Sequence, residues 1–250
     1  MSEGYNFLER AVTLSTASTT HTAADTATIK HHVALVSVLL VAGVLLLVGF
    51  AARAKLQNAK NALIPEKRLT LRTFFEVLAE FMVWLGDAAM GKENRKYLPF
   101  AATLFIFLLS MNMLGLIPGF VMPTDRIAVN AGLALLVFFL YNFWGIKEVG
   151  IGGYLKHMWG PVFAVGFFLF PIEIISHLIR PLSLTLRLFG NMTGDHIVLG
   201  VFTDLTRGLY VPVPVVFYFL GTIVCFIQSF VFTLLTMIYI RLAVAHEEHH

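Results

Sequence analysis

The sequence predicts an all-α membrane protein with five membrane-crossing helical elements and one interfacial amphipathic helix. Of its 250 residues, 58% are hydrophobic and only 13% are charged, and the mean hydropathy is +0.79. A soluble domain carries roughly 25% charged residues. Five apolar runs reach the length of about 20 residues that one crossing needs. In addition, charged residues inside the fourth run recur at helical spacing.

The first element is an apolar run over residues 33–52, long enough to span once. Residues 1–30 before it are polar and rich in Ser, Thr and Ala. We expect residues 1–32 to be an external segment in which Thr13–Thr28 form a loop or a weakly ordered tail. Residues 53–69 after it form a loop with several Lys and Arg. The positive-inside rule places that loop in the cytoplasm, and therefore the N-terminus outside.

An amphipathic helix is predicted over residues 70–91. Its apolar residues repeat at i, i+3, i+4 and i+7, and they are Leu71, Phe74, Phe75, Leu78, Met82, Leu85 and Ala89. Charged residues such as Glu76, Glu80 and Asp87 occupy the other face. We expect this helix to lie at the membrane surface. An ordinary soluble connecting helix is the alternative.

Two further spans are predicted at residues 98–120 and 127–146. The first contains Asn112, and the second contains Asn130 and Asn142. Such amides in apolar helices usually form hydrogen bonds between helices, so we interpret all three as packing contacts. Residues 147–160 are predicted to form a cytoplasmic loop interrupted by glycines.

The fourth run, over residues 161–203, contains most of the charged residues found in apolar sequence. A helix advances about 100° per residue, so most of its polar groups share one face. They are Glu173, His177, Arg180, Arg187, Asn191 and Asp195, with Ser183 towards one edge and His196 off the stripe. An ionised group at the bilayer centre costs at least ~3 kcal/mol, which indicates a functional helix. Because about 40 helical residues extend roughly 60 Å, the element must be strongly tilted, broken or re-entrant.

Arg187 is the strongest candidate for the functional centre. It stays protonated, so it can attract a carboxylate and block proton leakage, but it cannot relay protons. A straight helix separates it from Glu173 by roughly 21 Å, which favours a carboxylate from another subunit as its partner. Arg180 lies nearer the cytoplasmic end, where snorkelling to the surface is the simpler interpretation.

The last run, over residues 209–242, is uncharged until Arg241 and is longer than one perpendicular span. Residues of one helical stripe are polar or small: Tyr218, Thr222, Cys225, Ser229, Thr233 and Thr236, with Gln228 at the edge. This stripe can face the polar stripe of the preceding element. The tail, residues 243–250, is expected in the cytoplasm.

Several function classes are disfavoured by missing motifs. The chain has no P-loop sequence for nucleotide phosphates and no Cys/His spacing for a metal. Its one cysteine, Cys225, has no internal partner. We expect no cofactor, no metal site and no nucleic-acid partner.

Four segments resemble subunit a of the F-type (rotary) ATP synthase membrane sector. They are PLSLTLRLFGNM at residues 181–192, NMLGLIP at 112–118, GIGG at 150–153 and QSFVFTLLTMIY at 228–239. The resemblance extends from about Thr70 to the C-terminus. It implies a non-catalytic stator subunit in a bacterial inner membrane, with its last two elements tilted as a hairpin against a ring of c subunits. The peripheral-stalk b subunits and the rest of the synthase are implied partners.

The resemblance also assigns roles to residues. Arg187 matches an essential arginine that faces the ion-carrying carboxylate of the ring, between two offset half-channels. Glu173 matches a carboxylate of the cytoplasmic half-channel. Asn191 and Gln228 match polar neighbours of the arginine and the outer half-channel, where Asp195 and His196 are candidate relays. Supporting polar positions are His177, Ser183, Ser229 and Tyr239.

This sequence departs from the family pattern at Gly221, where many members carry an ionisable residue, and at Gly115, where some have Asp. The exact outer relay therefore stays open, as does the choice between H⁺ and Na⁺. The alternative function is a self-contained secondary ion transporter with a midplane charged site. Such transporters usually contain internal repeats, and no second copy of the Arg187 segment is present. A purely structural scaffold would not explain the polar stripe.

Overall fold

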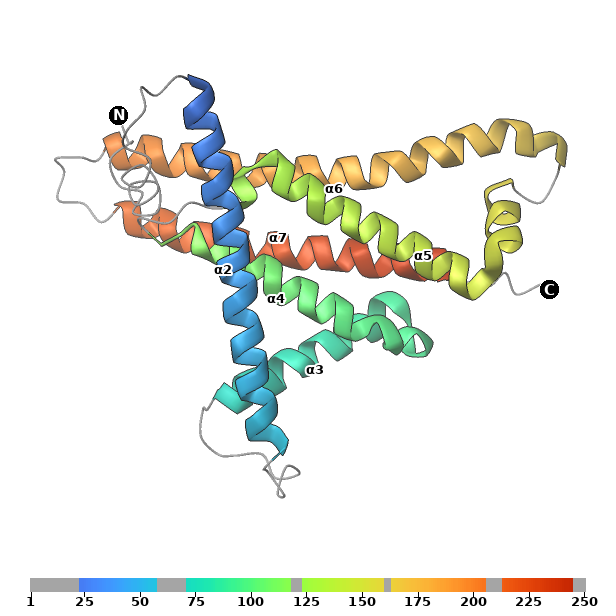
Figure 1. The fold of residues 1–250 in the computed structure, drawn as a ribbon, viewed down its shortest axis with the longest axis horizontal. Coiled ribbons are helices and arrows are strands. Elements are labelled where there is room, and N and C mark those ends of the chain that lie inside the picture. Colours follow the sequence, from blue (N-terminus) through green and yellow to red (C-terminus); the bar gives the residue numbers. More distant parts are fainter. Residues whose placement is uncertain (1–22, 58–70, 118–122, 160–162, 206–212, 245–250) are drawn as a thin grey trace.

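The computed structural model describes residues 23–57, 71–117, 123–159, 163–205 and 213–244, and every element in them is helical (Figure 1). The long helices are α2 (Ala23–Gln57), α3 (Leu71–Met90), α4 (Leu98–Leu114), α5 (Ile127–Trp159), α6 (Phe163–Leu205) and α7 (Val213–Val244). Two short 3₁₀ helices, η1 (Lys92–Tyr97) and η2 (Pro123–Asp125), connect them. The predicted all-helical class is confirmed for these residues.

Four segments of the described chain are long and apolar enough to cross a membrane. They are His32–Ala51, Lys92–Leu114, Ile127–Tyr154 and Tyr218–Val244. Four of the five predicted crossings thus coincide with a candidate span. The remaining one corresponds to α6, which is not among these segments and which carries the charged residues of the polar stripe.

Helices α5, α6 and α7 pack against one another and form the largest unit of the bundle. Figure 1 shows α6 and α7 extended along the long axis of the molecule, whereas α2 runs across them. Helix α4 packs on α7, and α3 packs on α7 and α4. The core between these helices is apolar, and its fully buried members include Phe105, Leu108, Leu188, Phe232 and Ile240.

Helix α3 has the amphipathic character that its sequence predicts. Met82 and Leu85 are buried, while Glu80 and Trp84 on other faces are exposed. The helix ends where Gly91 adopts a φ of 82°, a left-handed conformation that favours glycine. Arg95 of η1 then reaches back to Asp87 with two hydrogen bonds of 2.7 and 2.6 Å, which fixes the turn.

Two predicted boundaries differ from the structure. Helix α2 begins at Ala23, inside the segment expected to be weakly ordered, because its alanines have the highest helix propensity. The predicted loop at residues 147–160 is wrong over most of its length, because α5 continues helically to Trp159. The predicted glycine interruption is present within it, at Gly150, where φ is 80° and the helix changes direction.

Helix α6 is one continuous helix of 43 residues, so the broken and re-entrant alternatives are wrong for residues 163–205. Pro171 and Pro181 both lie inside it. Proline removes a backbone donor and bends a helix, and α6 is bent rather than straight in Figure 1. The carbonyl of Pro181 accepts a hydrogen bond from the Thr185 hydroxyl at 2.8 Å. The polar residues of α6 therefore follow a single helical register.

Candidate functional site

A cluster of acid, base and aromatic side chains surrounds Glu173 of α6. The Oε1 atom of Glu173 lies 3.4 Å from Nε2 of His177 and 3.8 Å from Nη2 of Arg180. All three residues come from the predicted polar face, since they are separated by four and seven positions. Their side chains are partly buried, with Glu173 the most exposed at 36%. We call these residues, with Tyr141, Tyr154 and Tyr239, the Glu173 cluster.

Tyrosines from α5 and α7 complete this cluster. The ring of Tyr239 lies 5.3 Å below the Arg180 guanidinium, in a cation–π arrangement, and 5.9 Å from the ring of Tyr141. The imidazole of His177 lies 6.3 Å from the ring centres of both Tyr141 and Tyr154. Three helices, α5, α6 and α7, thus contribute side chains to one polar site.

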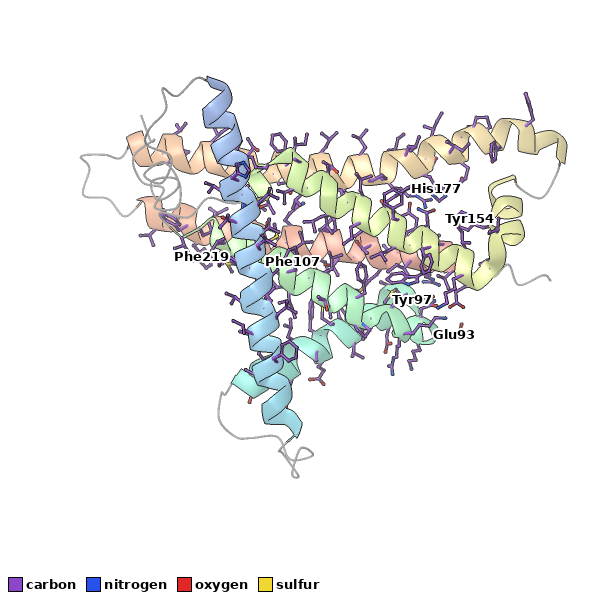
Figure 2. All side chains as sticks on the ribbon, viewed as in Figure 1. Glu93, Tyr97, Phe107, Tyr154, His177 and Phe219 are labelled. Atoms are coloured by element: carbon purple, nitrogen blue, oxygen red, sulfur yellow. The ribbon has the colours of Figure 1, made fainter. Side chains whose placement is uncertain are left out.

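Tyr154 reaches the cluster because α5 turns at Gly150. Beyond Gly150 the last segment of α5 runs towards α6 (Figure 1). Figure 2 shows the side chains of Tyr154 and His177 in the space between these two helices. The Tyr154 hydroxyl donates a hydrogen bond to Oδ1 of Asn142, whose own Nδ2 donates to the carbonyl of Phe138. Asn142 therefore anchors Tyr154 within α5, rather than joining two helices as predicted.

Arg187 lies two turns beyond Arg180 and is exposed on the surface of α6. Its neighbours Leu184 and Leu188 are buried in the bundle, so they fix the orientation of this part of the helix. The exposed face of α6 around it is apolar, with Ile172, Ile175, Ile179, Leu182 and Leu186. No ion pair joins Arg187 to any side chain that the structure describes. A permanent charge therefore stands on an apolar, outward-facing surface.

One turn beyond Arg187, an amide pair connects α6 to α7. Nδ2 of Asn191 donates a hydrogen bond of 2.6 Å to Oε1 of Gln228. Gln228 is only 2% exposed, and its Nε2 has no partner within the described residues. Gln228 thus faces α6 from the edge of the α7 stripe, as the sequence suggested it could.

Ser229 of the α7 stripe contacts α4 rather than α6. The Ser229 hydroxyl accepts a hydrogen bond of 3.1 Å from Nδ2 of Asn112 and donates one of 2.9 Å to the carbonyl of Cys225. The prediction that Asn112 forms a hydrogen bond between helices is therefore confirmed. Asn130 differs, because its Nδ2 donates to the Thr124 carbonyl of the neighbouring η2 segment at 2.7 Å.

The structure brings some predicted site residues together and separates others. Glu173, His177 and Tyr239 share one cluster, and Asn191 joins Gln228, whereas Ser229 belongs to the contact with α4. Ser183 lies half-buried on α6 between the two regions. Asp195 and His196 lie in α6, but their side chains fall outside the described residues.

The sequence analysis did not identify Tyr141 and Tyr154 as site residues, because an aromatic residue within an apolar segment looks like an ordinary residue of the hydrophobic core. The glycines at residues 150–153 were the available signal for Tyr154. Arg180 was interpreted as snorkelling, but it points into the Glu173 cluster, where it contacts a carboxylate and a tyrosine ring. No group of three or more His, Cys, Asp or Glu side chains suited to a metal occurs in the part of the chain that is described.

Together these residues form two polar regions on opposite sides of an arginine. The Glu173 cluster contains groups that bind and release protons, and the region of Asn191 and Gln228 contains only donors and acceptors among its described side chains. Between them, Arg187 presents a fixed positive charge to the outside of the bundle.

Comparison with known proteins gives consistent matches. The family model described as ATP synthase A chain matches residues 34–241. "ATP synthase subunit a" of Bdellovibrio bacteriovorus is 45% identical over 216 residues, which cover 86% of this chain and 92% of that protein. "ATP synthase subunit a 1" of Syntrophotalea carbinolica is 46% identical over 194 residues, which cover 76% and 80%. The subunit a of Solibacter usitatus is 43% identical over 185 residues, covering 74% and 78%.

Proposed function

Because the chain belongs to the ATP synthase subunit a family, we propose that it is the stator subunit that carries protons to and from a rotating ring of c subunits. It offers two half-channels, one from each side of the membrane, which do not meet. Protons cross only when a ring carboxylate moves from one half-channel to the other. The subunit itself catalyses no reaction of ATP. The observation that carries this proposal is the exposed Arg187 on an apolar face between two polar regions.

Arg187 serves as the gate. A ring carboxylate that arrives opposite it loses its proton, because the guanidinium favours the charged form of a nearby acid. The pair also avoids leaving either charge alone in a medium where an ionised group costs at least ~3 kcal/mol. Because the guanidinium stays protonated, it cannot hand a proton from one half-channel to the other. Protons are thereby prevented from crossing without rotation.

Each half-channel uses one polar region of α6. Glu173, with His177, Arg180 and Tyr239 around it, serves the cytoplasmic half-channel. Asn191 and Gln228 line the outer one, and the unpartnered Nε2 of Gln228 is suited to a channel water. Asp195 and His196 are the proposed outer relays. Ser183 and Ser229 are supporting polar groups.

The c-ring docks on the exposed apolar face of α6 around Arg187. This placement requires α6 and α7 to be strongly tilted as a hairpin, which agrees with α2 running across both of them in Figure 1. With α6 included as a crossing and α3 at the interface, the chain crosses five times, so the N-terminus is outside and the C-terminus is cytoplasmic. The host membrane is a bacterial inner membrane, and the peripheral-stalk b subunits complete the stator.

The domain division follows the same layout. An external segment, residues 1–32, precedes a single membrane domain, residues 33–250. Within that domain, the basic segment 53–69 and the tail 243–250 are cytoplasmic. Residues 58–70 and 245–250 lie outside the described part of the chain.

The test is ATP-driven proton pumping by the assembled complex in inverted membrane vesicles. Arg187→Ala is expected to assemble and to lose coupled pumping, because the ring carboxylate loses its fixed countercharge. Arg95→Ala removes an exposed arginine that pairs with Asp87 far from α6, and it should pump normally. Normal pumping by an assembled Arg187→Ala complex would exclude the proposed gate.

A further inference from the structure

Besides Glu173, the Glu173 cluster contains a second protonatable group, His177. The proposed gate at Arg187 does not require it. We propose that His177 and Glu173 form an acid–base pair that keeps the cytoplasmic half-channel supplied with protons, and that Tyr154 positions the imidazole. This inference rests on the proposed function, because it assigns a role within the proposed cytoplasmic half-channel.

The geometry allows direct exchange of a proton. Nε2 of His177 lies 3.4 Å from Oε1 of Glu173, one helical turn away on the same face of α6. A small rotation of either side chain brings these atoms within hydrogen-bonding distance, and resting sites are often longer than the working geometry. The imidazole is the more enclosed partner, with 13% of its side chain exposed against 36% for the carboxylate. The enclosed imidazole is the partner that contacts α5, through the rings of Tyr141 and Tyr154.

The groups around His177 differ in whether they can titrate near neutral pH. Arg180, on the same helix, stays charged at any working pH. Tyr141 and Tyr154 of α5, and Tyr239 of α7 beyond Arg180, carry hydroxyls whose ordinary pKa is about 10. Imidazole, with an ordinary pKa of about 6.5, is the side chain suited to change its charge between pH 5 and 8. His177 is thus the group of this cluster with the chemistry of a proton reserve.

The transfer needs no reactant besides the water of the half-channel. When Glu173 has given its proton to the ring, the bond between Nε2 and its hydrogen in protonated His177 breaks, and an O–H bond forms on the carboxylate. The imidazole becomes neutral and then takes a proton from hydronium or water in the channel, which leaves water or hydroxide. In the reverse direction, neutral His177 accepts the proton from Glu173 and releases it to water.

Tyr154 has a positioning role in this exchange. Its ring meets the imidazole at an interplanar angle of 69°, while the ring of Tyr141 meets it at 32°. Two aromatic rings of α5 thus lie beside the imidazole, which limits its freedom to rotate. The Tyr154 ring is itself fixed by the hydrogen bond from its hydroxyl to Asn142. Loss of that hydroxyl frees the tyrosine ring without removing it.

The test compares pumping at several pH values of the medium that faces the cytoplasmic half-channel, which is the outer medium of inverted vesicles. At about pH 6 protons are plentiful, and the assembled His177→Gln complex should pump within about twofold of wild type. At about pH 8.5 Glu173 must wait for scarce protons, and pumping should fall to between about a third and a tenth of wild type. A reduction by the same factor at every pH would indicate a structural role and would overturn the proposal.

Tyr154→Phe provides a second, milder test that keeps the ring. Its pumping relative to wild type should fall about twofold to threefold as the pH rises over the same range. Tyr97→Phe removes a hydroxyl that donates to Glu148 outside the cluster, and its ratio should not change with pH. If the His177 variant does not assemble, the Tyr154 variant decides, and a constant ratio there overturns the proposal.

Failure of the inference is distinct from failure of the proposed function. If Arg187→Ala abolishes pumping while His177→Gln shows a constant ratio, the acid–base pair is excluded and the gate stands. If Arg187→Ala pumps normally, the gate is excluded, and the acid–base pair loses its premise as well.

Discussion

Asn191 of α6 donates a hydrogen bond of 2.6 Å to Gln228 of α7, one helical turn beyond Arg187. This contact fixes the register between the helix that carries the arginine and its neighbour. It also holds a glutamine that is almost fully buried, with only 2% of its surface exposed. The position of Arg187 relative to α7 therefore depends on two uncharged amides.

Asn191→Leu should weaken both assembly and coupling. The change removes the donor and leaves the buried Oε1 of Gln228 without a partner, which costs about 1–3 kcal/mol. We expect a lower thermal stability of the purified complex and reduced ATP-driven pumping. Thr222→Val serves as the control, because it removes a more exposed hydroxyl of α7 whose one partner within the described residues is the Tyr218 carbonyl. Unchanged stability and pumping in Asn191→Leu would show that the amide pair is dispensable.

Glu173→Gln should reduce proton uptake from the cytoplasmic side while leaving the fold intact. The amide has the shape of the carboxylate but cannot hold an exchangeable acidic proton, so we expect pumping to fall at least about tenfold. Assembly and the amount of complex in the membrane are measured alongside.

A matched variant for this experiment is Glu93→Gln, at an exposed glutamate of η1 (Figure 2). It changes the same functional group outside the cluster, so its pumping should equal wild type. Equal pumping by Glu173→Gln and Glu93→Gln would remove Glu173 from the conduction path.

The polar face of α6 could be predicted from sequence because helical geometry alone determines it. Glu173, His177 and Arg180 are separated by four and seven positions, and they meet in the structure as the 100° rule requires. The amphipathic pattern of α3 followed from the same arithmetic, and its predicted bounds differ from the observed ones by one residue at each end. Such features depend on neighbours along the chain, which the sequence contains directly.

Contacts between helices could not be predicted in the same way. Nothing local distinguishes Tyr141 and Tyr154 from other aromatic residues of α5, because their role depends on how α5 meets α6. The helical character of residues 151–159 was missed because glycine has a low helix propensity, while packing against α6 can override propensity. Tertiary packing between α5 and α6 therefore determines the parts of the site that the helical periodicity of the sequence does not predict.

The pair of Asp87 and Arg95 should make stability depend on pH at the turn after α3. Two hydrogen bonds from the Arg95 guanidinium hold the pKa of the Asp87 carboxyl below its usual range. A carboxyl with a lowered pKa in the folded state contributes stability above its unfolded pKa of about 3.9, and loses it as the pH falls through the folded value. Asp87→Asn should therefore lower the melting temperature at neutral pH.

The difference between wild type and Asp87→Asn should shrink as the pH falls from about 4 through the lowered pKa of Asp87 in the folded state, because only below that value is the carboxyl uncharged. Thermal unfolding of the detergent-solubilised complex over a pH series measures this. A difference in melting temperature that stays constant down to the most acidic pH would contradict the assignment of the effect to the carboxylate.

Gly150→Ala should disturb the Glu173 cluster from a distance. At a φ of 80°, a Cβ atom costs about 1–2 kcal/mol, so alanine strains the turn of α5. This strain comes from the backbone, since no neighbouring atom lies within 4 Å of the added carbon. Relief of that strain moves the segment that carries Tyr154 away from His177. We expect a lower melting temperature of the complex and a loss of pumping that grows as the cytoplasmic-side pH rises, as for Tyr154→Phe.

Gly152→Ala is the matched control, because that glycine lies two residues further along, has space for a Cβ and needs no left-handed backbone. Alanine also has the higher helix propensity, so this variant should be at least as stable as wild type. If the two alanine variants behave alike, backbone strain at Gly150 does not position Tyr154, and the direction of the last helical segment must be determined by its side chains.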